Sequence, residues 1–216
     1  GMTNNVETFE RPDLFERDTW SKQVYDVNAV MRAIASGVLP GAGLPLILFG
    51  HSRGGITASL VASRNGSRVA GLVAAAAPHQ GDALDKQQKR LLREQGFLAS
   101  PSSRTGQNLR VGREWLEEIE AAPSNSDPLI AIRSIACPIM LIHGSADHTV
   151  PLASVQLLAQ AADERARIVV IDDASHTFDA PNPLPTDAAV PSNTQQLIDV
   201  ACEFALQCCP PTNTAL

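Results

Sequence analysis

Residues 46–55 read LILFGHSRGG, an apolar run that leads through a glycine-rich turn into the start of a helical pattern. Ser52 lies in the turn, with Gly50 and Gly54 two positions away on either side, in the order G-x-S-x-G. A serine on so tight a strand-to-helix bend needs neighbours without side chains, because Cβ atoms at those positions would clash. The pattern predicts that Ser52 is a nucleophile whose Oγ stands above the end of a strand. The alternative is an ordinary glycine-rich loop, perhaps binding phosphate, but a P-loop lysine and a G-x-G-x-x-G pattern are both absent.

The same alternation of apolar runs and amphipathic helices continues along the chain. Apolar residues recur at three- and four-residue steps from Trp20 to Ile34, which predicts a helix that is capped by Thr19 or Asp18 and ends near Gly37. The further predicted strands are residues 44–49, 69–75, 139–143 and 167–171, and the further predicted helices are residues 56–64, 152–162 and 194–206. Strands that alternate with helices indicate βαβ units. The sequence therefore predicts an α/β fold with a mostly parallel sheet and helices on both faces.

Residues 79–127 interrupt this rhythm. They are rich in Gln, Arg, Glu and Ser, with helical stretches at residues 84–95 and 113–121. An insertion at this place would sit over the strand ends, where ligands bind in open α/β sheets, so we expect a small lid. The alternative is a surface excursion with no part in substrate binding. The whole chain, residues 1–216, is predicted to be a single domain with irregular tails at 1–18 and 207–216.

Two downstream segments supply partners for Ser52. Asp147 follows the predicted strand at 139–143, and His176 lies on the loop after the last predicted strand. An imidazole that accepts the serine proton, and a carboxylate that orients the imidazole, together make a serine nucleophilic. The order predicts Ser52 as nucleophile, Asp147 as orienting acid and His176 as general base, with the Arg53 backbone N–H as one oxyanion donor. The alternatives are a turn aspartate that caps the next helix and a structural histidine.

These three segments together resemble the α/β-hydrolase superfamily, and within it the dienelactone-hydrolase-related and serine-aminopeptidase-like esterases. The resemblance runs from about Thr19 to near Leu206 and is most specific in residues 50–55, 144–151 and 174–178. It implies an α/β-hydrolase-type sheet and hydrolysis of carboxylic esters through an acyl-enzyme. Dienelactone hydrolases proper use a cysteine nucleophile, so Ser52 departs from them and their substrate is not carried over.

The resemblance also predicts that strands are missing at the N-terminal side. Members place several strands before the helix that precedes the nucleophile strand, and one of these strands ends in the loop that gives the second oxyanion N–H. Here only 18 residues precede that helix, and none reads as a strand. We therefore expect an apolar sheet edge at Leu44–Phe49, and a homodimer in which a second copy covers it. An incomplete oxyanion hole leaves a truncated or inactive pseudo-hydrolase, acting as a binding domain, as the alternative.

The charge, the cysteine content and the lengths of the apolar runs limit the kinds of partner and cofactor that we expect. The formal net charge is −6 with acidic and basic residues interspersed, which argues against a nucleic-acid-binding surface. The four cysteines contain no C-x-x-C pair and no zinc-like spacing, so no metal, cofactor or disulfide framework is expected, and a reducing cytoplasm is the default location. The sequence shows no signal-peptide pattern and no apolar run approaching the roughly 20 residues that span a bilayer. We expect a small-molecule ester as substrate, with neither nucleic acid nor membrane as partner.

Residues of the substrate pocket are predicted from position alone. His51 adjoins the nucleophile, His148 adjoins Asp147, and the predicted lid contributes Phe97, Leu98 and Trp115. The apolar lid residues could instead pack the lid onto the body of the domain. A peptidase or thioesterase would use the same three catalytic residues, because fold and triad do not determine the leaving group.

Overall fold

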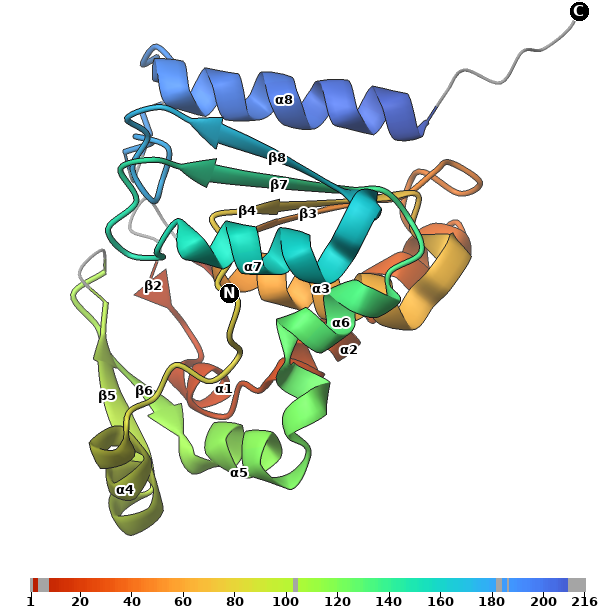
Figure 1. Ribbon diagram of the computed structural model, residues 1–216. Coiled ribbons are helices and arrows are strands. Elements are labelled where there is room, and N and C mark those ends of the chain that lie inside the picture. Colours follow the sequence, from red (N-terminus) through yellow and green to blue (C-terminus); the bar gives the residue numbers. More distant parts are fainter. Residues whose placement is uncertain (1, 4–7, 103–104, 182–183, 186, 210–216) are drawn as a thin grey trace, which may run out of the picture. The chain divides into compact units, whose positions relative to one another are not determined.

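The computed structural model describes the chain apart from residues 1, 4–7, 103–104, 182–183, 186 and 210–216 (Figure 1). The chain divides into two compact units. Unit 1 comprises Gly1–Asp26 and Asp82–Ser126, and unit 2 comprises Val27–Gly81 and Asp127–Leu216. The segment predicted as an insertion at 79–127 thus corresponds to the second part of unit 1, which also takes in N-terminal residues. The predicted lid role of this segment stays a prediction.

Unit 2 is built around a four-stranded sheet in the order β3-β4-β7-β8. Its strands are β3 (Ile47–His51), β4 (Gly71–Ala75), β7 (Ile139–Gly144) and β8 (Ala166–Ile171). Every neighbouring pair is parallel, which confirms the predicted fold class. Because all four strands point the same way, the loops that follow them all leave the sheet at the carboxyl ends of the strands.

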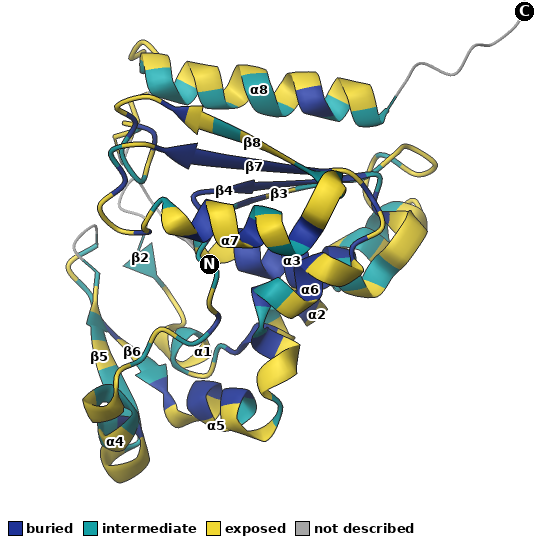
Figure 2. Cartoon of the chain, in the orientation of Figure 1, coloured by how far each residue is buried: buried dark blue, intermediate teal, exposed yellow. Residues whose placement is uncertain are grey.

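Helices cover both faces of this sheet (Figure 1). The helices that lie wholly within unit 2 are α3 (Arg53–Asn65), α6 (Pro128–Ser134), α7 (Ala153–Ala162) and α8 (Ser192–Cys208), with single 3-10 turns at η1 (Gly66–Arg68) and η3 (Asp163–Arg165). Leu72 and Leu141 pack toward α3, α6 and α7, whereas Val73 and Ile142 pack toward α8. Figure 2 shows β4 and β7 buried along their whole length. Burial on both faces explains why these strands read as continuous apolar runs rather than alternating ones.

Strand β3 lies at one edge of the sheet and pairs only with β4 among the described strands. It begins at Ile47 rather than at the predicted Leu44, since Pro45 has no backbone N–H to contribute to a ladder. Phe49 is 51% exposed on this strand. The described residues before β3 add no strand to this sheet. A second copy covering the edge stays a prediction.

Helix α2 (Trp20–Ala35) confirms the predicted helix at 20–34 and runs from unit 1 into unit 2. The expectation that residues 1–18 are irregular was wrong. Unit 1 contains the paired strands β1 (Met2–Thr3) and β2 (Thr8–Phe9) and the helix α1 (Pro12–Glu16). These elements are too short to show a period in the sequence. Pro12 lies in the first turn of α1, where its missing N–H costs no helical hydrogen bond.

The rest of unit 1 contains an antiparallel hairpin that the sequence analysis did not predict. The hairpin consists of β5 (Phe97–Pro101) and β6 (Asn108–Gly112). It is flanked by α4 (Lys86–Gln95), α5 (Arg113–Ala121) and the 3-10 turn η2 (Pro123–Ser126). Helix α4 begins at Lys86 because Asp85 and Gln88 form a reciprocal capping box. The core of unit 1 includes Trp20 and Trp115, whose ring centroids are 6.3 Å apart. Among the described residues, every helix is too short or too polar to cross a membrane.

Candidate active site

Ser52 occupies the sharp bend between β3 and α3. Its backbone has φ 55° and ψ −125°, a conformation that side-chain-bearing residues rarely adopt and that costs about 1–3 kcal/mol. A Cβ on Gly50 would lie 2.1 Å from the Gly54 carbonyl oxygen, so only glycine fits there. The Ser52 N–H donates to the carbonyl of Ala75 across 2.8 Å, which fixes the bend to the end of β4. The sheet therefore holds the strained serine in place.

Asp147 lies on the loop that follows β7. Its Oδ1 accepts hydrogen bonds from the backbone N–H groups of Thr149 and Val150, both at 2.8 Å. The loop also lies against the segment after β8, because the Ala146 N–H donates to the carbonyl of Ala174. This close approach requires glycine at position 144, because a Cβ there would lie 2.2 Å from the same Ala174 carbonyl oxygen. The loop that carries Asp147 (residues 145–150, the acid loop) and the segment after β8 that leads to His176 (the histidine loop) are thus joined by a main-chain hydrogen bond.

His176 bridges the acid and the nucleophile. Its Nδ1 lies 2.8 Å from Asp147 Oδ2, and its Nε2 lies 3.0 Å from Ser52 Oγ. A carboxylate only accepts, so Nδ1 carries the proton and donates it to Asp147. In the neutral ring Nε2 is then an acceptor, and the Ser52 hydroxyl donates to it. This is the tautomer that a general base for Ser52 requires.

The loop that carries His176 is anchored on both sides. The Ser175 N–H donates to the Asp179 carboxylate across 3.2 Å, and the Asp179 N–H donates back to the Ser175 hydroxyl across 3.0 Å. Asn193 and Thr194, in the first turn of α8, donate to Asp179 and to the Phe178 carbonyl at 2.6 Å each. Helix α8 therefore sets the position of the His176 loop as well as covering one face of the sheet.

The electrostatics favour a charged carboxylate at Asp147. Burial by itself raises the pKa of the Asp147 carboxyl, but the hydrogen bonds from His176, Val150 and Thr149 outweigh it and hold this pKa below its usual range. Asp147 is therefore ionised at neutral pH. Burial lowers the pKa of the His51 imidazole, which keeps a second positive charge away from His176.

The remaining predicted site residues lie in different places. The His51 Nε2 is 2.7 Å from the His176 carbonyl oxygen, and Arg53 is the first residue of α3. His148 is exposed on the acid loop. The three predicted lid residues all belong to unit 1, where Trp115 is buried against Trp20 and the half-buried Phe97 and Leu98 lie on β5. Their part in substrate binding stays a prediction.

His143 falls inside the predicted strand at 139–143 and was not among the predicted site residues. The structure places it on β7, fully buried, with its Nε2 3.4 Å from Asp147 Oδ2. The spacing of four residues before the acid was the available signal. A histidine in an apolar run, however, is more often a satisfied core residue than part of a site.

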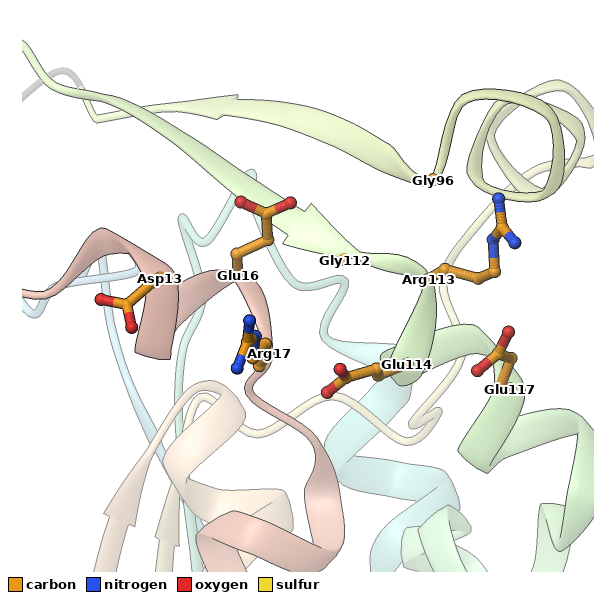
Figure 3. Close-up of a pocket in the computed structure, with 8 residues that line it drawn as sticks. All are labelled: Asp13, Glu16, Arg17, Gly96, Gly112, Arg113, Glu114 and Glu117. Atoms are coloured by element: carbon orange, nitrogen blue, oxygen red, sulfur yellow. The ribbon is translucent and has the colours of Figure 1, made fainter.

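Unit 1 contains a separate pocket of about 360 Å³ (Figure 3). Acidic side chains from α1 and α5 and two arginines line it: Asp13, Glu16, Arg17, Arg113, Glu114 and Glu117, with Gly96 and Gly112. Glu114 is paired with Lys22 at 2.8 Å. The mixture of charges favours no one ligand, and none of the predicted site residues lines this pocket. Among the described residues no group of three or more His, Cys, Asp or Glu is placed to hold a metal ion.

Comparisons with known proteins agree with this fold. The model of the alpha/beta hydrolase family matches residues 6–190. The esterase domain of a Rhodothermus marinus protein superposes with a TM-score of 0.58 at 21% identity, covering 85% of this chain and 68% of that one. A monoacylglycerol lipase of Paleococcus ferrophilus gives 0.63 at 16% identity, covering 89% and 77%. Mouse alpha/beta hydrolase domain-containing protein 10 gives 0.63 at 20% identity, covering 88% and 70%. A search of curated protein sequences found no match.

Proposed function

This chain belongs to the alpha/beta hydrolase family, and on that premise we propose that it is a serine hydrolase that cleaves carboxylic esters. The observation that carries the proposal is the continuous hydrogen-bond chain from Ser52 Oγ through both nitrogens of His176 to Asp147. Both contacts lie within the range expected of a working nucleophile and base.

In the first half of the reaction Ser52 Oγ attacks the ester carbonyl carbon as its proton passes to His176 Nε2. The carbonyl electron pair moves to its oxygen, giving a tetrahedral oxyanion. Asp147 stabilises the imidazolium that forms, since its carboxylate already accepts the Nδ1–H. The tetrahedral species collapses when the bond to the alkoxy group breaks, and His176 gives its proton to the departing alcohol. The acyl group remains on Ser52.

In the second half water replaces the alcohol. His176 takes a proton from the water, the hydroxyl attacks the acyl carbon, and the acid leaves as Ser52 recovers its proton. The oxyanion of both halves would lie at the N-terminus of α3, where Arg53 contributes its backbone N–H. One such donor is typically worth about 10²–10³ in rate.

Two considerations favour esters over amides. Structurally similar proteins include an esterase domain and a monoacylglycerol lipase, whose names both indicate ester substrates. An alkoxide is also a better leaving group than an amine, so an ester makes the smaller demand on the oxyanion hole. Peptidase and thioesterase activities remain outcomes of the test, as does an inactive binding domain. The cytoplasmic location and the homodimer remain proposals with them.

The test is hydrolysis of p-nitrophenyl esters of increasing acyl length, together with labelling by a fluorophosphonate, which phosphonylates only an activated serine. Wild type should show turnover and label at Ser52, and Ser52→Ala should show neither. Ser36→Ala is the matched control, because Ser36 is an exposed serine directly after α2 whose hydroxyl donates to the nearby Ala33 carbonyl. It should behave as wild type. A folded wild type that neither turns over nor labels would leave the binding-domain alternative.

A further inference from the structure

A second histidine faces the acid of the site from inside the sheet. His143 lies on β7 and is fully buried. Its Nε2 lies 2.9 Å from the carbonyl oxygen of Val150 and 3.4 Å from Asp147 Oδ2. The mechanism derived above makes no use of this side chain.

The contacts of His143 determine where its proton resides. Both oxygens near Nε2 can only accept, so Nε2 carries a hydrogen. The other ring nitrogen, Nδ1, is buried and has no hydrogen-bond partner. A second proton there would need an acceptor that the buried surroundings do not provide, and burying an unpaired N–H is costly. His143 is therefore a neutral imidazole whose single N–H points at the acid loop.

That N–H reaches the loop at two points. The distance to Val150 is normal for a hydrogen bond, whereas 3.4 Å to Asp147 is long for one. The Val150 N–H in turn donates to Asp147 Oδ1. His143 thus fixes the carbonyl of a residue whose amide fixes the carboxylate, and it directs the positive end of its N–H toward the oxygen that His176 uses.

We propose that His143 is a positioning residue for the acid of the site: a neutral ring on a central strand that holds the 147–150 loop in register. It also shares the charge on Asp147 Oδ2 without competing for the catalytic proton. The inference rests on the proposed function, because it concerns the same hydrogen-bond chain.

The groups around Asp147 make the effect on pH dependence predictable. Among the described residues, the titratable side chains in contact with its carboxylate are His143 from β7 and His176 from the loop after β8. His51, at the end of β3, also senses its charge. Without the His143 N–H, more of the carboxylate charge acts on His176 and favours its protonated form. Activity should then require a higher pH.

The test compares three substitutions. His143→Leu removes the donor at similar volume, whereas His143→Gln can place an amide N–H near the same point. Ile139→Val, at the other end of β7, perturbs the core without touching the acid loop. For each we would measure kcat and KM on a p-nitrophenyl ester, the pH profile of kcat/KM, and the fluorophosphonate labelling rate. The labelling rate reports on Ser52 even if the preferred substrate is not found.

For His143→Leu we expect kcat and the labelling rate to fall about tenfold with KM nearly unchanged, and the acid limb to move to higher pH. Gln should restore most of the rate, and Ile139→Val should leave the pH profile in place. A folded His143→Leu protein with the wild-type rate and profile would overturn the proposal. So would an equal shift of the profile in Ile139→Val, since that would indicate a general structural effect.

Nitrogen-15 NMR of the wild-type histidines gives a readout that depends on neither activity nor a variant. We expect His143 to be protonated at Nε2 and unprotonated at Nδ1 at neutral pH. The opposite tautomer, or a charged ring at neutral pH, overturns the inference even if His143→Leu does not fold. The expected tautomer in a protein without turnover or labelling would support the contact while contradicting the proposed function.

Discussion

His51 donates its Nε2–H to the main-chain carbonyl of His176 across 2.7 Å. The ring centroids of His51 and His176 lie 4.9 Å apart, and those of His51 and Phe178 lie 6.1 Å apart in an edge-to-face arrangement. The nucleophile bend is therefore connected to the histidine loop by a contact that does not involve Ser52 Oγ. The loop of His176 and the ring of His51 are therefore held together by a contact that involves none of the reacting atoms.

His51→Leu should lower kcat by about tenfold, because the carbonyl of His176 loses its partner and the base loop can drift by a fraction of an ångström. His51→Gln, which can still donate to that carbonyl, should lose less. Steady-state kinetics separates this role from the predicted pocket role. A rise in KM at unchanged kcat would mean that His51 contacts substrate instead of positioning the base.

Gly50→Ala should destabilise the protein by at least about 2 kcal/mol and abolish turnover, since its Cβ would overlap the backbone of Gly54. Gly54→Ala is the matched control within the same motif. A Cβ there meets nothing within 4 Å, and the position lies in the first turn of α3, so stability should be unchanged or slightly higher. Urea unfolding of both variants measures the difference. Equal stabilities would contradict the strained-bend account.

Asp147→Asn should lower kcat by about 10³–10⁴, because a neutral amide neither stabilises the imidazolium nor selects the tautomer of His176. Turnover within tenfold of wild type would rule out Asp147 as the acid, and would leave the turn-aspartate interpretation.

The same variant should change how stability depends on pH. The pKa of Asp147 is depressed in the folded state, so the stability it contributes is complete above the unfolded pKa of about 3.9 and is lost as pH falls through the lower folded value. Urea unfolding between neutral pH and about pH 3 should therefore be less steeply pH-dependent in Asp147→Asn than in wild type. Identical slopes would contradict the predicted depression of this pKa.

The edge strand β3 gives a prediction about assembly. Phe49 is half exposed on a strand with one described neighbour, and proteins rarely leave such an edge uncovered. Light scattering at micromolar concentration should give twice the mass of one chain, and Phe49→Glu should shift it toward the monomer. A wild-type monomer would argue against the homodimer.

Much of unit 2 could be predicted from the sequence because its strands are buried on both faces. Apolar runs such as Ile139–Gly144 strongly favour buried strands. Gly50 meets a local steric requirement that leaves a clear pattern in the sequence, whereas the steric requirement predicted for Gly54 is not found, because a Cβ there meets nothing within 4 Å. The three residues of the hydrogen-bond chain were identified from their order along the chain. The sheet then brought them together.

The features that the sequence did not predict depend on contacts between residues in the folded chain rather than on a hydrophobic repeat. The β5–β6 hairpin is half exposed and its strands are only five residues long, so its alternation is weak. Helix α1 has five residues and shows no amphipathic repeat. His143 could be recognised as part of the site only once the turn after β7 placed the acid loop against its ring.

The position of strand β8 bears on how the proposed active site would come apart on heating. It occupies the edge of the sheet opposite β3, with Ile168 and Val170 each about two-fifths exposed, and it leads directly into the loop of His176. Ser52 and His176 are 124 residues apart, so their contact exists only while this outer strand is docked. Elements with few buried contacts open at lower free energy than the core. Partial opening at this edge would separate His176 from Ser52 while β4 and β7 remain folded. We therefore expect the proposed activity to be lost on heating before the helical signal.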